Sequence, residues 1–186
     1  MAYPLITERL SIAPLAGADA AAFARYRQEP GVALYQSWSA DFSEAAALSI
    51  VAGQPAGDLP GPGQWLQLGV HFRNGGRLLG DVAVHRLSEQ PDTFELGVTF
   101  AGEHQGRGYA TESMLALLGF LFDVHGAHRV LAHCDARNGA VAAVLRKAGL
   151  QQESRQVEAD WFKGEWTTLD TYALLGREWP RGAARG

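Results

Sequence analysis

The most informative segment of the sequence is Gly102-Glu103-His104-Gln105-Gly106-Arg107-Gly108-Tyr109-Ala110-Thr111-Glu112. It follows a predicted strand and opens a predicted helix of about Gly108 to His125, whose apolar residues recur at helical spacing. A helix start exposes unpaired backbone N–H groups and a partial positive charge. Gly106 and Gly108 carry no Cβ, so an anion can approach those groups closely. The stretch therefore predicts an anion site, most plausibly for a phosphate or pyrophosphate.

Two nucleotide-binding loops match this stretch poorly. A P-loop needs GxxxxGK[ST], which the sequence lacks, and a dinucleotide fingerprint needs GxGxxG within a parallel βαβ unit. The segment from Gly106 to Thr111 lacks the third glycine, and the strands before it form an antiparallel meander. A glycine-rich helix start that binds nothing stays open as an alternative.

Three short strands joined by tight turns precede the stretch. Leu66, Leu68, Val70 and Phe72 alternate with polar or small residues, which is the period of a half-buried strand. The next residues, Asn74-Gly75-Gly76, are a strong hairpin turn. Apolar residues alternate again over 78–84 and 94–100. Consecutive hairpins of this kind predict an antiparallel meander rather than a parallel core.

The remaining segments add helices and outer strands. We expect a helix from about Ala20 to Gln28, capped by Asp19 and stopped by Glu29-Pro30-Gly31, and a second helix from Ser43 to Ala52. The glycine- and proline-rich loop at 53–63 is either a mobile lid or a passive insertion, and the passive interpretation is favoured. Further strands are expected at 7–14, 129–134, 151–158 and 167–175, with a helix at 138–148. This order predicts an α+β fold in α/β/α layers, with a mixed, mostly antiparallel twisted sheet of about seven strands and helices on both faces.

Length and composition are those of one globular domain. The chain has 186 residues, 47% of them hydrophobic, so we expect a single domain over 1–186 with a core of about 5–180. The net charge is −4, without the basic excess of a nucleic-acid-binding protein. No apolar run is long enough to cross a membrane, and no secretory signal is visible. Cys134 is the only cysteine, so the chain is expected in the reducing cytoplasm.

Gln105-x-x-Gly108-x-Ala110 resembles the Q/R-x-x-G-x-G/A pyrophosphate loop of the GNAT superfamily of acyl-CoA-dependent N-acetyltransferases. Further segments resemble the RimJ/RimL-type branch of ribosomal-protein alanine N-acetyltransferases. In order they are Thr7-Glu8-Arg9-Leu10, Glu95-Leu96-Gly97, Gly108-Tyr109-Ala110-Thr111-Glu112, Asp135-Ala136-Arg137-Asn138 and Gly164-Glu165-Trp166. The resemblance covers nearly the whole chain and implies acetyl-CoA as the acetyl donor.

The resemblance also implies which residues hold acetyl-CoA. The pantetheine arm would run between two strands that splay apart, along Val98, Thr99 and Phe100. The pyrophosphate would be held by the loop and helix start, Gln105, Gly106, Arg107, Gly108, Tyr109, Ala110 and Thr111. Asn138 would contact the thioester end, and it is equally suited to cap the helix that follows. For the Arg107 side chain, a solvated position is favoured over a phosphate contact.

Transfer to an amine needs an unprotonated nucleophile, a stabilised tetrahedral oxyanion and departure of the thiolate. By the resemblance, a backbone N–H near 98–100 would hold the oxyanion. Glu95 is the candidate base, weighed equally against a structural role, whereas His71, Asp81 and His85 are interpreted as structural or solvated. Val141 stands where the branch carries Ser, so no general acid is visible. A thiol pKa of about 8.5 makes unaided departure of the thiolate reasonable.

The expected function is therefore acetyl transfer from acetyl-CoA to a protein N-terminal amine or a small-molecule amine, by direct attack in a ternary complex. The missing Ser leaves a non-catalytic acyl-CoA-binding or regulatory module as an alternative, and an interaction domain without a cofactor is a third hypothesis. No histidine or cysteine spacing matches a metal site, so no metal is expected. Neither a nucleic acid nor a membrane is an expected partner. The oligomeric state is open, with a homodimer as one alternative.

Overall fold

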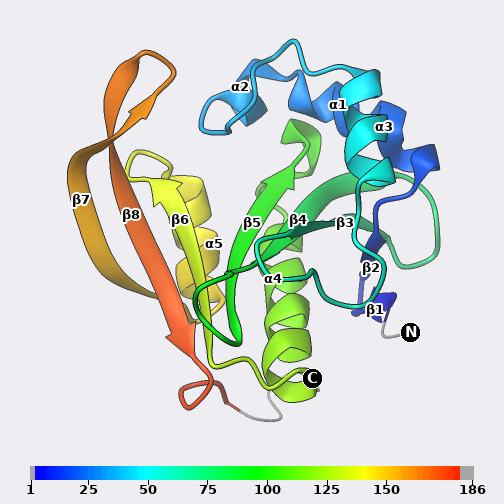
Figure 1. Ribbon diagram of the computed structural model, residues 1–186. Coiled ribbons are helices and arrows are strands. Elements are labelled where there is room, and N and C mark those ends of the chain that lie inside the picture. Colours follow the sequence, from blue (N-terminus) through cyan, green and yellow to red (C-terminus); the bar gives the residue numbers. More distant parts are fainter. Residues whose placement is uncertain (1–2, 181–186) are drawn as a thin grey trace.

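The computed structural model describes residues 3–180. They form one eight-stranded sheet in the order β1-β2-β3-β4-β5-β6-β8-β7 (Figure 1). The strands are β1 (Leu5–Ile6), β2 (Leu10–Pro14), β3 (Trp65–Phe72), β4 (Leu78–Arg86), β5 (Thr93–Phe100), β6 (Arg129–Asp135), β7 (Gln151–Phe162) and β8 (Glu165–Leu175). Neighbouring strands are antiparallel except β5 and β6, which run parallel. The mixed, mostly antiparallel sheet is confirmed, with one more strand than the sequence indicated.

The additional strand, β1, lies before the expected first strand, which begins at Leu10 instead of Thr7 because the chain turns between these two residues. The Thr7 N–H donates to the Leu10 carbonyl at 3.0 Å, and the Leu10 N–H donates to Thr7 Oγ1 at 2.9 Å. These two bonds reverse the chain, so β1 pairs with β2 instead of extending it. The Thr7 hydroxyl also donates to Glu112 Oε1 at 2.6 Å, which ties the turn to the long helix after the glycine-rich stretch.

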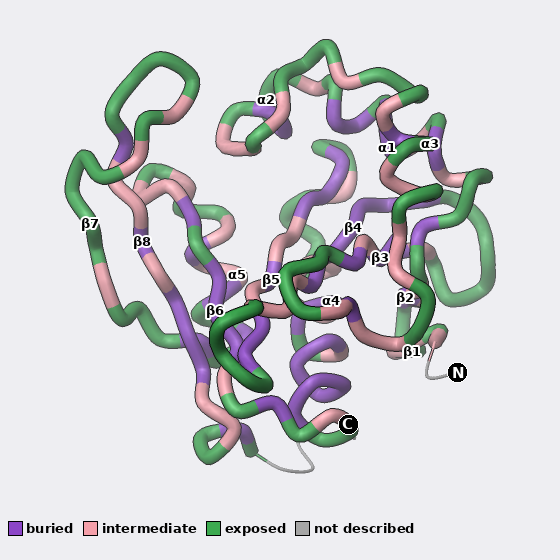
Figure 2. The backbone as a smooth tube through the Cα atoms, viewed as in Figure 1, coloured by how far each residue is buried: buried purple, intermediate pink, exposed green. Residues whose placement is uncertain are grey.

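The central meander forms as its alternation predicts. β3 pairs with β4, and β4 with β5, through the Asn74-Gly75-Gly76 turn and a second turn before Thr93. On one face of these strands the apolar side chains, Leu66, Leu68 and Val82 among them, are fully buried in the main core. Figure 2 shows this buried layer running along β4, β5 and the helix packed against them. The meander therefore supplies the rigid floor of the fold.

Helices contribute to two separate core clusters. The α-helices of residues 3–180 are α1 (Ala20–Arg27), α2 (Pro30–Ala33), α3 (Glu44–Ala52), α4 (Tyr109–Gly119) and α5 (Gly139–Lys147). Met114 of α4 and Leu145 of α5 belong to the main core, whereas Phe23 of α1 and Ala47 of α3 belong to the second cluster. Figure 1 shows α1, α2 and α3 gathered apart from α4 and α5. The expected helices on both faces of the sheet are confirmed.

The start of the first helix differs from expectation. Asp19 does not cap α1, because its carboxylate accepts from the Ala16 N–H at 3.0 Å and contacts His71 Nε2 at 2.8 Å. Pro30 follows the end of α1 as expected, but it also begins α2, where the missing N–H of proline costs nothing. Ser43 caps α3 as expected, by accepting from the Ala46 N–H at 3.1 Å.

A buried polar cluster fixes α1 to the sheet. Asp81 of β4 is 1% exposed and accepts from the Tyr26 hydroxyl and the Gln67 amide, and its carboxylate lies 3.4 Å from Arg27 Nη2. Burial raises the pKa of Asp81, although its three partners oppose the rise. Asp81 pairs with Thr99 of β5 in the sheet register. The cluster therefore holds α1, and α2 directly after it, beside the end of β5.

The last hairpin is longer than its sequence pattern indicated. β7 reaches Phe162 and β8 begins at Glu165, so only Lys163-Gly164 forms the turn. β7 is an edge strand and most of its residues are exposed, so apolar alternation does not mark its full length. Within residues 3–180, no helix has the length and apolar character needed to span a membrane.

Candidate active site

A cavity of about 390 Å³ opens where β5, α4, α5 and the α2 region meet. It is lined by all but one of the residues that the sequence assigns to acetyl-CoA: Val98, Thr99, Phe100, Gln105, Gly106, Gly108, Tyr109, Ala110, Thr111 and Asn138. The exception is Arg107, whose exposed position agrees with the solvated side chain that was favoured. The structure therefore brings the strand end, the glycine-rich loop and Asn138 to one place.

The glycine-rich loop presents the open start of α4 to this cavity. Gly106 and Gly108 adopt left-handed φ angles of +72° and +82°, which residues with a Cβ rarely adopt. The first helical bond runs from the Glu112 N–H to the Gly108 carbonyl at 3.0 Å. The N–H groups of the three residues between them are thus free of helical partners and add to the positive end of the helix dipole. A Cβ on Gly106 would meet no protein atom within 4 Å, which leaves room for an anion there.

Arg9 braces this loop from the first β-turn. Its guanidinium donates from Nε to Glu112 Oε2 at 2.6 Å and from Nη1 to the Arg107 carbonyl at 3.1 Å. It also lies 4.6 Å from the centre of the Tyr109 ring. On the opposite side, the Gln105 amide donates to the Phe100 carbonyl at 2.9 Å. The loop is therefore held between β5 and the Thr7–Leu10 turn.

β5 and β6 diverge at the cavity. Their parallel pairing covers only Thr93 with Arg129, Phe94 with Val130, and Glu95 with Leu131. Beyond Glu95, β5 has no recorded partner on the β6 side within residues 3–180, and its last residues line the cavity. The splayed strand pair expected from the family resemblance is therefore present in the fold.

The start of α5 forms another wall. Asn138 accepts from the Val141 N–H at 3.2 Å, so the expected helix-cap role is confirmed, and the same residue lines the cavity. Val141 also lines the cavity, together with Ala140, Ala143 and Val144. The residues of α5 that line the cavity carry no hydroxyl group, in agreement with the absent Ser.

Sequence reasoning missed several cavity residues. Tyr35 and Gln36 line it after α2, a region that the sequence pattern marked only as the end of a helix. His104 also lines the cavity, and its place within the Gly102–Glu112 segment could have marked it as a site residue. Its Nε2 is buried and has no hydrogen-bond partner among the described residues. Burial lowers the pKa of His104, which favours the neutral ring.

The candidate base lies apart from the cavity lining. Glu95 Oε2 is 3.3 Å from His85 Nδ1, and the His85 ring stacks on Trp65 at 4.6 Å. Asp81 is held in the buried cluster and His71 in the pair with Asp19, so both are structural, as interpreted from the sequence. Glu95 and His85 are the two of these residues that pair with each other, and both side chains are partly exposed.

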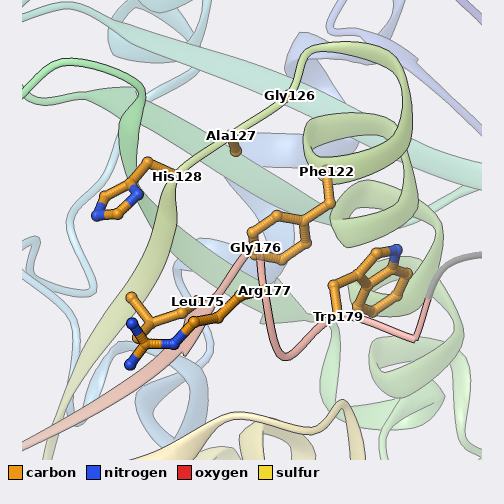
Figure 3. A pocket seen from close by; sticks show the side chains of 8 residues that line it. All are labelled: Phe122, Gly126, Ala127, His128, Leu175, Gly176, Arg177 and Trp179. Carbon is orange, nitrogen blue, oxygen red and sulfur yellow. The ribbon is translucent and has the colours of Figure 1, made fainter.

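A second cavity, of about 260 Å³, lies beyond the far end of α4. Figure 3 shows its lining, Phe122, Gly126, Ala127, His128, Leu175, Gly176, Arg177 and Trp179. No residue assigned to acetyl-CoA or to catalysis lines it. No group of His, Cys, Asp or Glu side chains suited to a metal ion occurs within residues 3–180. Cys134 is buried, and burial raises the pKa of its thiol to about 11.

A family profile described as an acetyltransferase (GNAT) domain matches residues 9–151. The chain belongs to this family. YnaD of Bacillus subtilis (strain 168), an uncharacterized N-acetyltransferase, is 29% identical over 102 residues, which cover 55% of this chain and 59% of YnaD. The chain therefore spans less than two thirds of that relative.

Two solved structures show the same fold. A GNAT-family acetyltransferase from Bacillus anthracis matches with a TM-score of 0.83 and 24% identity, over 93% of this chain and 98% of that one. RimJ of Mycobacterium smegmatis, solved in complex with CoA-disulfide, matches with a TM-score of 0.79 and 21% identity, over 94% and 86%.

The family match and the RimJ neighbour confirm the resemblance and the fold class drawn from the sequence. The family match also confirms the prediction of a GNAT acetyltransferase domain, and acetyl-CoA as its donor stays a proposal. The individual residues that hold acetyl-CoA in this GNAT domain stay predictions.

Proposed function

We propose that this GNAT domain binds acetyl-CoA in the 390 Å³ cavity and acetylates a primary amine by direct attack in a ternary complex. The observation that carries the proposal is the open start of α4. Tyr109, Ala110 and Thr111 line the cavity with N–H groups that precede the first helical bond, and no Cβ crowds Gly106 or Gly108. This arrangement suits a pyrophosphate.

β5 supports the other half of the donor. Its backbone beyond Glu95 lacks a β6 partner within the described residues, so the N–H and C=O groups on that side, apart from the Phe100 carbonyl that accepts from Gln105, are available to an extended ligand. A pantetheine arm carries two amide groups and can bond to such a strand edge as an added strand does. Val98, Thr99 and Phe100 are the residues of β5 placed to do this.

Three groups of the chain act on the reaction in this proposal. A backbone N–H near Val98 to Phe100 holds the developing oxyanion, a contribution of about 10²–10³ in rate. Glu95 removes the amine proton, directly or through water, and His85 beside it is placed to relay that proton. The α5 residues that line the cavity offer no hydroxyl, so the thiolate leaves without a hydroxyl donor from that helix.

The acceptor is a protein N-terminal amine or a small-molecule amine. Tyr35 and Gln36 line the cavity and are not among the residues assigned to the donor, and their side chains suit a neutral amine nucleophile. The cytoplasm stays the proposed compartment, on the ground of the single cysteine. A homodimer stays an open alternative.

A transfer assay tests the proposal on the full chain. Acetyl-CoA is supplied with short peptides that begin with Ala or Ser, with linear polyamines and with small metabolite amines. Thiol release and the mass of the acetylated product are both measured. Peptides with a blocked N-terminus serve as matched controls. Amine-dependent release with a matching product supports the proposal, and tight CoA binding without release on any amine contradicts the catalytic part.

A further inference from the structure

The tip of the β7–β8 hairpin carries a lysine where the backbone disfavours one. Lys163 and Gly164 form the two-residue turn, with φ angles of +50° and +88°. Tight hairpins with two positive φ angles favour Asn, Asp or Gly at the first position, because a long side chain gains nothing there and its Cβ is crowded. An unfavourable backbone conformation at one residue points to a role for its side chain.

The Lys163 side chain bonds to a distant part of the chain. Its ammonium donates to the Ala33 carbonyl at 2.6 Å and to the Trp38 carbonyl at 2.8 Å. These acceptors lie 130 and 125 residues away in sequence. The ammonium also lies 5.3 Å from the Phe162 ring. One cation therefore holds both ends of the Ala33–Trp38 segment, which begins at the end of α2.

The segment held in this way carries cavity residues. Tyr35 and Gln36 lie between the two carbonyl acceptors and line the cavity. A second bridge supports the same arrangement, because Arg137 pairs with Glu165 of the hairpin at 2.9 Å and lies 5.9 Å from the Tyr35 ring. The hairpin and the α2 region are thus joined through two cations from different elements.

The residues assigned to the donor make no contact with this bridge through Lys163. The assigned donor contacts come from β5, the Gln105–Thr111 loop and α5, and Lys163 bonds to none of them. Apart from this bridge, the Ala33–Trp38 segment is held at Trp38, whose Nε1 donates to the Arg27 carbonyl at 3.2 Å, while Leu34 is exposed. A loop that must be ordered at each binding event weakens affinity for whatever it contacts.

We propose that Lys163 is a positioning residue for the acceptor amine, which it serves by fixing the Ala33–Trp38 segment so that Tyr35 and Gln36 keep their places in the cavity wall. The inference rests on the proposed function, because it assigns that wall to the acceptor. Loss of the bridge raises the KM for the amine and leaves the Kd for CoA unchanged. Donor binding and acceptor binding are therefore separable at one residue.

Lys163→Asn tests this inference without damaging the turn, since Asn tolerates the left-handed conformation better than Lys does. Lys163→Arg keeps a cation of similar reach, so its amine KM should stay close to that of the wild type. Arg25→Met removes an exposed cation from α1 and serves as the control for charge alone. Urea unfolding of each variant verifies that the fold is intact.

Three measurements give the expected result. Lys163→Asn raises the amine KM on the order of tenfold, the size expected for the loss of hydrogen bonds from a charged group. Calorimetry with CoA gives the wild-type Kd within about twofold, by the same conversion. Amide hydrogen exchange over residues 34–37 accelerates in Lys163→Asn and not in Arg25→Met.

An unchanged amine KM in Lys163→Asn overturns the inference, even if exchange over 34–37 accelerates, because the bridge would then be structural only. An equal loss of CoA affinity also overturns it. A wild-type chain that acetylates no amine overturns the proposed function together with this inference. If the wild type is active and Lys163→Asn has the same amine KM as the wild type, the inference alone is overturned.

Discussion

The glycine at the start of α4 offers the sharpest perturbation of the donor site. Gly108→Ala adds one methyl group to a residue that lines the cavity and caps the helix. Gly75→Ala is its matched control in the β3–β4 hairpin. Gly75 has a φ angle of +84°, close to the +82° of Gly108, and does not line the cavity.

The two substitutions should cost the same stability. A left-handed conformation costs a residue with a Cβ about 1–2 kcal/mol relative to glycine. A Cβ on Gly75 would meet nothing within 4 Å, and a Cβ on Gly108 would meet only Arg9 Nη2 at 3.4 Å, the end of a side chain that can move. The losses in unfolding free energy should therefore agree within about 0.5 kcal/mol.

Their effects on CoA binding should differ. The Gly108 methyl group would move a pyrophosphate away from the N–H groups at the start of α4. A hydrogen bond to a charged group contributes about 1.5–3 kcal/mol, so loss of one raises the Kd by about 10- to 100-fold. Gly75→Ala should leave the Kd unchanged.

Calorimetric titration of the full-length wild type and both variants with CoA measures these values, and urea unfolding measures the stability terms. The reasoning is refuted if Gly108→Ala binds CoA within about twofold of Gly75→Ala, because the donor would then not approach the helix start. An affinity loss in Gly75→Ala as large as that in Gly108→Ala would refute it equally, since the effect would follow from stability.

Three further outcomes are expected. Glu95→Gln should lower kcat on the order of 10²-fold and leave the Kd for CoA unchanged, and an unaltered kcat in thiol-release assays would remove Glu95 from the proton path. Arg27→Met should lower the free energy of urea unfolding by about 3 kcal/mol, because it leaves Asp81 buried without its cation; a loss under about 1 kcal/mol contradicts this. Burial alone would raise the pKa of Glu112, but hydrogen bonds from Thr7 and Arg9 outweigh it and hold the pKa below its usual range. The stability from this group is present above the unfolded pKa of about 4.3 and is lost as pH falls through the lower folded pKa. The stability gap between wild type and Glu112→Gln should therefore close from about pH 5 downward, and a gap independent of pH would contradict the assignment.

The sequence predicts more of the sheet and of α4 than of the α1–α3 region. Alternation over Leu66 to Phe72 and helical spacing after Gly108 are local signals, so the meander and the long helix are predictable. α2 has four residues, too few for any period to show. Its place depends on the contact of Arg27 with Asp81, 54 residues away, which no local pattern contains.

The same division holds within the site. The glycine-rich loop and Asn138 were predictable because their chemistry is written in consecutive residues. Tyr35 and Gln36 belong to a segment that is bonded to Lys163, a residue far away in the sequence, so no local pattern places them at the cavity. The turn at Thr7–Leu10 was hidden for a related reason, since Glu112, which bonds to Thr7, lies 105 residues away. Long-range polar contacts, more than hydrophobic pattern, separate the predictable part of the site from the rest.

Only three residue pairs join β5 to β6, so this junction divides the sheet into two unequal parts. One part holds β1 to β5, and the other holds β6, β8 and β7. A ligand that lies along the free edge of β5 and also reaches α5 contacts both parts and links them. The free energy of unfolding then depends on the ligand concentration, because a ligand that binds only the folded chain adds RT ln(1 + [L]/Kd) to it. If the proposed donor is that ligand, the stability of the folded domain rises with the concentration of acetyl-CoA.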